Sequence, residues 1–122
     1  METGLTYTSK TVVDERNTAI ALGSGDMPVF ATPAMMALME NAAMKAVKEH
    51  LPEGSTTVGG HIESSHLKPS PIGAEVEATA TLDKIDGRKL YFTVVARQGD
   101  NVIGEGKHLR FIVDRERFLS KL

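Results

Sequence analysis

The sequence predicts an α+β fold in which an antiparallel sheet wraps around one long central helix. The segment from about 33 to 50 is rich in Ala and Met and carries only a narrow polar stripe, which is typical of a helix that is buried along most of its surface. The segments that follow alternate apolar and polar residues with a period of two, and tight-turn sequences separate them. One long helix against such strands indicates an α+β architecture.

The first expected elements are a strand, a loop and the central helix. Residues 5–13 are enriched in Thr and Val, as strands are, and residues 22–28 contain the Gly and Pro residues of a loop. Thr32 and Pro33 predict the helix start, because a Thr side chain can cap free backbone N–H groups and Pro suits the first helical position. We expect the helix to end at about His50, before a turn that contains Pro and Gly.

Four further strands and a short terminal helix are expected after the central helix. The strands are expected at 56–68, 75–82, 90–97 and 102–113. Asp86 and Gly87 form a tight-turn signal, and residues 99–101 form a second one. The terminal helix is expected at 114–122, with Asp114 as its cap.

The composition limits the classes of function. A chain of 122 residues is expected to form a single domain spanning 1–122. The formal net charge of −2 argues against nucleic-acid binding, which needs a basic face. Cysteine is absent, which excludes disulfides and a Cys nucleophile, and no apolar run has the length of a membrane span. We therefore expect a cytoplasmic protein without a membrane partner.

Two segments resemble a known family. In residues 29–40, Thr32 opens the helix and Glu40 follows eight residues later. In residues 58–73, His66 precedes a Pro-rich turn and a Gly. In order and spacing these segments resemble the fluoroacetyl-CoA thioesterase subfamily of hotdog-fold acyl-CoA thioesterases. The resemblance implies a hotdog fold, a homodimer or higher oligomer with active sites at the subunit interface, and hydrolysis of a coenzyme A thioester without a metal or other cofactor.

The resemblance also implies the site residues. Thr32, Glu40 and His66 match the catalytic residues of the family, and Gly59 and Arg110 are weaker matches to positions that bind substrate. The sequence leaves the roles open. Glu40 can act as the nucleophile or as a general base on water, while Thr32 can act as the nucleophile or as a hydrogen-bond partner of His66.

Glu40 is unusual without any reference to a family. Helical residues advance by about 100° each, so Glu40 lies well away from the polar stripe of Asn41, Lys45 and Lys48. Its neighbours one turn away are all apolar, and none is a cation that could pair with it. The functional interpretation is a perturbed carboxylate in a site. The alternative is a carboxylate at the edge of the buried face that reaches water or a distant partner.

The other candidates have ordinary alternatives. Thr32 can be a plain helix cap, and His66 can be an ordinary strand histidine. His61 and His66 are five residues apart, which places them on opposite faces of a strand and argues against a shared metal. His108 and Arg110 share a strand face, and Arg110 can be a salt-bridge residue or a contact for a phosphate of coenzyme A.

The loop before the central helix bears on the substrate. Residues 23–28 are small and polar, whereas the fluoroacetyl-specific enzyme is expected to carry aromatic residues there. We therefore expect the same chemistry on a different small acyl group. One alternative is a hotdog protein that binds acyl-CoA or another small ligand without turnover. A hotdog dehydratase is a second alternative, but the His and Asp pair of that class is not found in the sequence.

Overall fold

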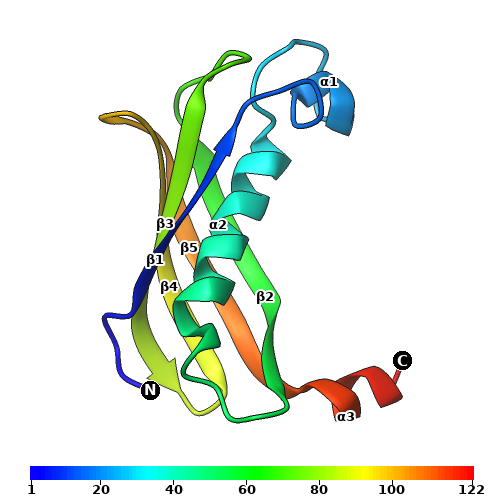
Figure 1. Cartoon of the computed structure of the whole chain (residues 1–122), viewed down its shortest axis with the longest axis vertical. Helices are drawn as coiled ribbons and strands as arrows, with labels where there is room; N and C mark the ends of the chain where they lie inside the picture. Colours follow the sequence, from blue (N-terminus) through cyan, green and yellow to red (C-terminus); the bar gives the residue numbers. More distant parts are fainter.

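The structure is a computed structural model that describes residues 1–122. Five antiparallel strands form one sheet in the order β1-β3-β4-β5-β2, and helix α2 lies across one face of it (Figure 1). The elements are β1 (Thr6–Val12), α1 (Ala19–Leu22), α2 (Thr32–Lys48), β2 (Ser55–His66), β3 (Glu75–Asp86), β4 (Lys89–Gln98), β5 (Asn101–Asp114) and α3 (Arg115–Ser120). The predicted α+β class, a sheet around one central helix, is confirmed. No helix is both long enough and apolar enough to cross a membrane.

The core lies between α2 and the sheet. Alternate residues of β3 and β4 point toward the helix and are buried, which is the period-two pattern that the sequence showed. The buried face of α2 consists of Met35, Met39 and several small residues, including Ala42 and Ala46. Small side chains allow the helix to lie close to β1 and β3, so that 17 buried residues form one apolar cluster.

The start of α2 differs from the prediction. Ala31 occupies the N-cap position, no side chain caps the helix, and Thr32 is the first helical residue. The chain before the helix is held instead by backbone bonds, since Phe30 N–H donates to the carbonyl of Ser70 and Ala31 N–H donates to that of Asn17. The prediction that Thr32 caps the helix is therefore wrong, and its hydroxyl is free for another partner.

The short helices flank this framework. Helix α1, which was not predicted, lies beside the start of α2 (Figure 1). Thr18 caps it by accepting a hydrogen bond from Ala21 N–H, and Gly23 ends it with a φ of 70°. The predicted terminal helix is present as α3, where Asp114 accepts a hydrogen bond from Arg117 N–H.

A β-bulge interrupts β2, which lies at an edge of the sheet and pairs only with β5. The register shifts between Gly59 and His61, so Gly60 is the extra residue. A side chain at Gly60 would collide with the ring of Phe111. The bulge reverses the alternation of faces, so Gly59 before it and His66 after it both face α2 although they are seven positions apart.

Candidate active site

The first residue of α2 meets the last residue of β2. Thr32 Oγ1 lies 2.7 Å from Nδ1 of His66, which is a hydrogen bond. His66 pairs across the ladder with Gly104 of β5, and a Cβ at Gly104 would lie 2.5 Å from Sδ of Met35 on α2. The absence of a side chain at Gly104 therefore allows the start of the helix to approach the strand that carries the histidine.

The surroundings of His66 favour its neutral ring. Burial lowers the pKa of His66, and the backbone of Lys68 partly opposes this shift. Nε2 is buried and has no hydrogen-bond partner. The nearby backbone of Lys68 favours the protonated form of the ring, but its effect on the pKa is smaller than that of burial. In the tautomer with the proton on Nε2, Nδ1 can accept the proton of the Thr32 hydroxyl. The pair then has the arrangement of a nucleophile and its general base.

A cavity of about 280 Å³ opens beside this pair. It lies between α1, the segment that enters α2 and the end of β2. Its lining is mostly small or apolar, and it consists of Ala19, Ser24, Val29, Phe30, Thr32, His66, Leu67, Lys68 and Pro69. The Thr32 hydroxyl therefore borders a space that can hold a small group.

Glu40 lies elsewhere within the same chain. Eight residues along a helix correspond to a rise of about 12 Å, so its carboxylate does not reach Thr32 or His66. Glu40 Oε2 is instead 3.9 Å from Nη1 of Arg110, and a Cβ at Gly59 would lie 3.0 Å from the same oxygen. The structure thus divides the predicted residues into two clusters, Thr32 with His66 and Glu40 with Gly59 and Arg110.

Arg110 is held firmly behind the carboxylate. Its Nε donates to Thr57 Oγ1 at 2.8 Å, its Nη2 donates to the carbonyl of Thr57 at 3.0 Å, and its Nη1 lies 3.2 Å from Nε2 of His108. The side chain of Arg110 is 8% exposed and that of Glu40 is 43% exposed. Burial lowers the pKa of Arg110 and Glu40 partly opposes this, but a guanidinium stays protonated at neutral pH. Glu40 therefore faces a fixed positive charge on one side and solvent on the other.

The sequence did not assign a role to Thr57, His108 or Gly104. The spacing of two between His108 and Arg110 indicated a shared face, and both side chains are buried on the face of the sheet that carries the core. Thr57 shares that face with Gly59, two residues later, but its contact with Arg110 crosses from β2 to β5. No local signal marks Gly104, because its role depends on the helix above it.

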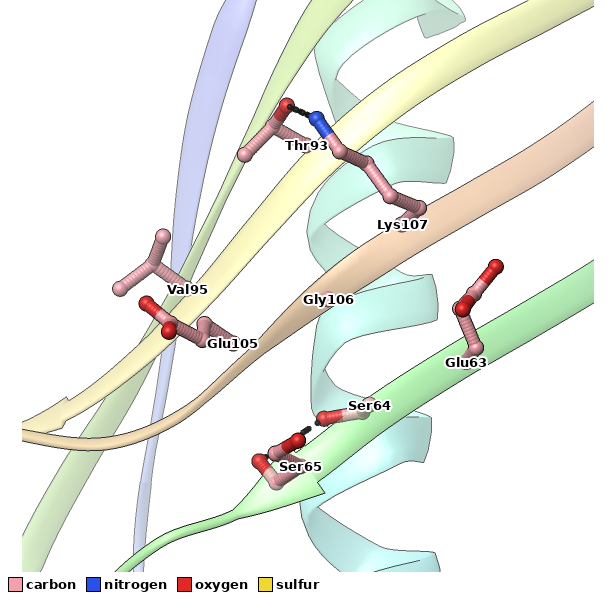
Figure 2. A pocket seen from close by; sticks show the side chains of 8 residues that line it. All are labelled: Glu63, Ser64, Ser65, Thr93, Val95, Glu105, Gly106 and Lys107. Atoms are coloured by element: carbon pink, nitrogen blue, oxygen red, sulfur yellow. Dashed lines mark hydrogen bonds between the residues drawn. The ribbon is translucent and has the colours of Figure 1, made fainter.

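A larger hollow lies on the opposite face of the sheet. Figure 2 shows it in front of the strands, with α2 behind them, and its volume is about 520 Å³. It is lined by Glu63, Ser64, Ser65, Thr93, Val95, Glu105, Gly106 and Lys107. Several of its polar groups are paired, since Lys107 Nζ donates to Thr93 Oγ1 at 2.9 Å and the Thr93 hydroxyl donates to Asp83. None of the predicted site residues reaches this hollow.

A sheet curled around one helix, with a histidine on the edge strand that contacts the first helical turn, defines a class of protein. The structure of a thioesterase superfamily member from Thermus thermophilus is 28% identical to this chain, with a TM-score of 0.91 over 98% of this chain and 89% of that one. The class is therefore the hotdog-fold thioesterases, as the resemblance implied.

The family within this class follows from the sequence match. The model of the fluoroacetyl-CoA-specific thioesterase family, FlK, matches residues 13–116, and the chain belongs to this family of acyl-CoA thioesterases. The chain is 37% identical over 94 residues to the fluoroacetyl-CoA thioesterase of Streptantibioticus cattleyicolor, which covers 77% of this chain and 68% of that protein. A solved structure of a threonine-to-serine mutant of FlK in complex with acetyl-CoA is 32% identical, with a TM-score of 0.92 over 99% of this chain and 96% of that one.

Proposed function

We propose that this chain hydrolyses the thioester of a small acyl-coenzyme A to the free acid and coenzyme A. The observation that carries the proposal is the 2.7 Å hydrogen bond between Thr32 and His66 beside a cavity of about 280 Å³. Membership of the thioesterase family supports it, as do FlK structures in complex with acetyl-CoA and with fluoroacetate and CoA. The loop at 23–28 lacks aromatic residues, which favours an acyl group other than fluoroacetyl.

The proposed chemistry begins with Thr32. Nδ1 of His66 takes the proton of the Thr32 hydroxyl while Oγ1 attacks the thioester carbonyl carbon. The carbon–sulfur bond then breaks, and the sulfur of coenzyme A takes the proton from His66. Water hydrolyses the resulting ester on Thr32, which releases the acid and restores the hydroxyl. Pro33 has no N–H, so the N–H groups of Thr32 and Ala34 are the ones in the first turn of α2 without intrahelical partners. They lie at the positive end of the helix dipole and stabilise the oxyanion in both steps.

We propose that Glu40 joins this site from a second copy of the chain and activates the water of the second step. Within one chain the carboxylate is about 12 Å from Thr32 along the helix, which is too far to share a substrate carbonyl. The free edge of β2 offers a way to bring the clusters together. If two β2 edges pair antiparallel about a two-fold axis, the Gly59 end of one strand lies beside the His66 end of the other.

Release of free thiol from a panel of short acyl-CoAs tests the activity. We expect Thr32→Ala and His66→Ala to lose at least about 100-fold in kcat, since each removes one member of the nucleophile pair. His50→Ala is the matched control, because His50 is exposed and remote from the pair, and it should keep wild-type activity. Binding of acyl-CoA without thiol release from any substrate would refute the proposal and indicate a binding protein instead.

The shared site is tested by mixing two inactive variants. Random exchange of Thr32→Ala and Glu40→Ala protomers makes half of the dimers mixed, and each mixed dimer contains one intact site if Glu40 acts across the interface. The mixture should therefore regain about a quarter of wild-type activity. A mixture that stays as inactive as the two parents would show that each chain carries its site alone.

A further inference from the structure

The proposed chemistry does not use His108, although this histidine is buried next to the charged pair of the site. Its side chain lies on β5 two residues before Arg110, and the residue is 3% exposed. Its ring makes two polar contacts. Nδ1 is 2.7 Å from the carbonyl oxygen of His61, and Nε2 is 3.2 Å from Nη1 of Arg110.

These two contacts determine where the proton of the ring lies. A carbonyl oxygen only accepts hydrogen bonds, so Nδ1 of His108 carries the proton and donates it to His61. A guanidinium only donates, so Nε2 must present its lone pair to Arg110. The ring is therefore neutral and in a single tautomer. Burial, which lowers the pKa of His108, agrees with this state.

The neutral ring completes the support of Arg110. Thr57 binds the guanidinium through two bonds on one side, and His108 binds Nη1, the nitrogen that faces Glu40. Arg110 is thus oriented before any substrate binds. Nη1 stays 3.9 Å from Glu40 Oε2, so the charge acts on the carboxylate while the oxygen keeps its lone pairs for another partner.

The bulge in β2 contributes to the same arrangement. His61 is the first residue after the register shift, where the ladder between β2 and β5 is interrupted. Its carbonyl oxygen is the acceptor that holds Nδ1 of His108. Gly59 lies on the other side of the bulge, and a Cβ there would crowd Glu40 Oε2 at 3.0 Å. His61 after the bulge therefore anchors His108, and the missing side chain of Gly59 before it leaves room for the carboxylate.

We propose that His108 is a positioning residue which, as a neutral imidazole held by the carbonyl of His61, fixes Arg110 in the orientation that Glu40 needs. This inference rests on the proposed function for its kinetic effect. His108 does not touch substrate, and it acts only through Arg110.

Two substitutions separate the two ring contacts. His108→Gln retains an acceptor at the distance of Nε2 and can still bind Arg110. His108→Asn retains a donor near the position of Nδ1 for His61 but is too short to reach Arg110. We expect His108→Asn to lower kcat by about 10- to 100-fold, the effect of losing a hydrogen bond to a charged group, and His108→Gln to recover most of it. His50→Asn is the matched control and should leave kcat unchanged.

A double-mutant cycle tests whether His108 acts through Arg110. In the Arg110→Gln background, His108→Asn should change kcat by less than about twofold, because the group that it positions is already gone. Losses that multiply fully, or a His108→Gln variant as impaired as His108→Asn, would overturn the inference. Thermal unfolding of each variant confirms that the fold is intact.

The tautomer can be measured without any activity. Long-range nitrogen–proton correlation spectra of the labelled wild-type protein at pH 7 should show His108 neutral with its proton on Nδ1. A proton on Nε2, or a doubly protonated ring, would overturn the inference even if an asparagine variant failed to fold. A wild-type protein that hydrolyses no acyl-CoA would refute the proposed function instead, so the two failures are distinguishable.

Discussion

Replacing Gly104 by alanine is expected to disturb the contact between α2 and β2. The new Cβ would lie 2.5 Å from Sδ and 2.7 Å from Cε of Met35, and 2.9 Å from the backbone oxygen of Ser65. Restriction of the unfolded chain favours alanine by roughly 0.5–1 kcal/mol. Overpacking costs roughly 1–3 kcal/mol, and it is the larger effect because one of the crowded atoms belongs to the backbone. We expect a net loss of about 1–2 kcal/mol in the free energy of unfolding.

The same change should impair the proposed reaction more than it destabilises the fold. Relief of the clash moves the start of α2 away from β2, which lengthens the 2.7 Å contact between Thr32 and His66. A displacement of about 1 Å in a catalytic pair reduces kcat by about 100-fold. Urea unfolding gives the stability, and thiol release from the best acyl-CoA substrate gives kcat.

A second substitution identifies the cause. Met35→Ala removes both side-chain atoms that the new Cβ would meet, so Gly104→Ala should cost less stability and less kcat in that background than in the wild type. The reasoning would be refuted if Gly104→Ala left stability and kcat unchanged. It would also be refuted if the two losses were the same with and without Met35.

Three further outcomes are expected. Burial lowers the folded-state pKa of His66 and His108 below the value of about 6.5 in the unfolded chain, so the unfolded chain binds more protons below that pH. The free energy of unfolding should therefore level off only about one pH unit above 6.5 and decrease on acidification, and urea titrations that show a gain would contradict this. Glu40→Gln should lower kcat by about 100-fold or more, because it removes the proposed general base. The melting temperature should stay within a few degrees of wild type, because this carboxylate is partly exposed, and Glu49→Gln serves as the control. Gly60→Ala should lower both stability and kcat, because the new side chain would collide with Phe111 and shift the bulge that orients the end of β2. An unchanged unfolding midpoint would show that the bulge tolerates the change.

The sequence alone was sufficient for the fold class and for the order of all elements except α1. Period-two alternation is a local property, and in β3 and β4 it matches the burial that the structure shows. The Ala- and Met-rich segment likewise predicted the central helix, which ends at Lys48 rather than at about His50. Helix α1 was missed because four residues are too few to show a period.

The candidate residues were also visible in the sequence, but their grouping was not. Thr32, Glu40 and His66 were predicted as one set, and the rise of a helix already separates Thr32 from Glu40 by about 12 Å. The role of Thr32 as a cap was predicted wrongly, because a Thr before Pro is a local signal whereas its actual partner lies 34 residues away. The catalytic assignments themselves stay predictions until the variants are measured.

Tertiary structure decided which side chains meet. The alternation in β2 is broken at Gly60, so the faces of Gly59 and His66 could not be counted from sequence spacing, and one extra residue reverses every side chain after it. The partners of Arg110 come from two strands, and the approach of α2 to β2 depends on the missing side chain of Gly104. The sequence therefore determined the chemistry that the chain carries, because that depends on residue type and local period. Register, bulge and the distance between helix and sheet determined where that chemistry is assembled, because those properties arise from contacts between segments far apart in the chain.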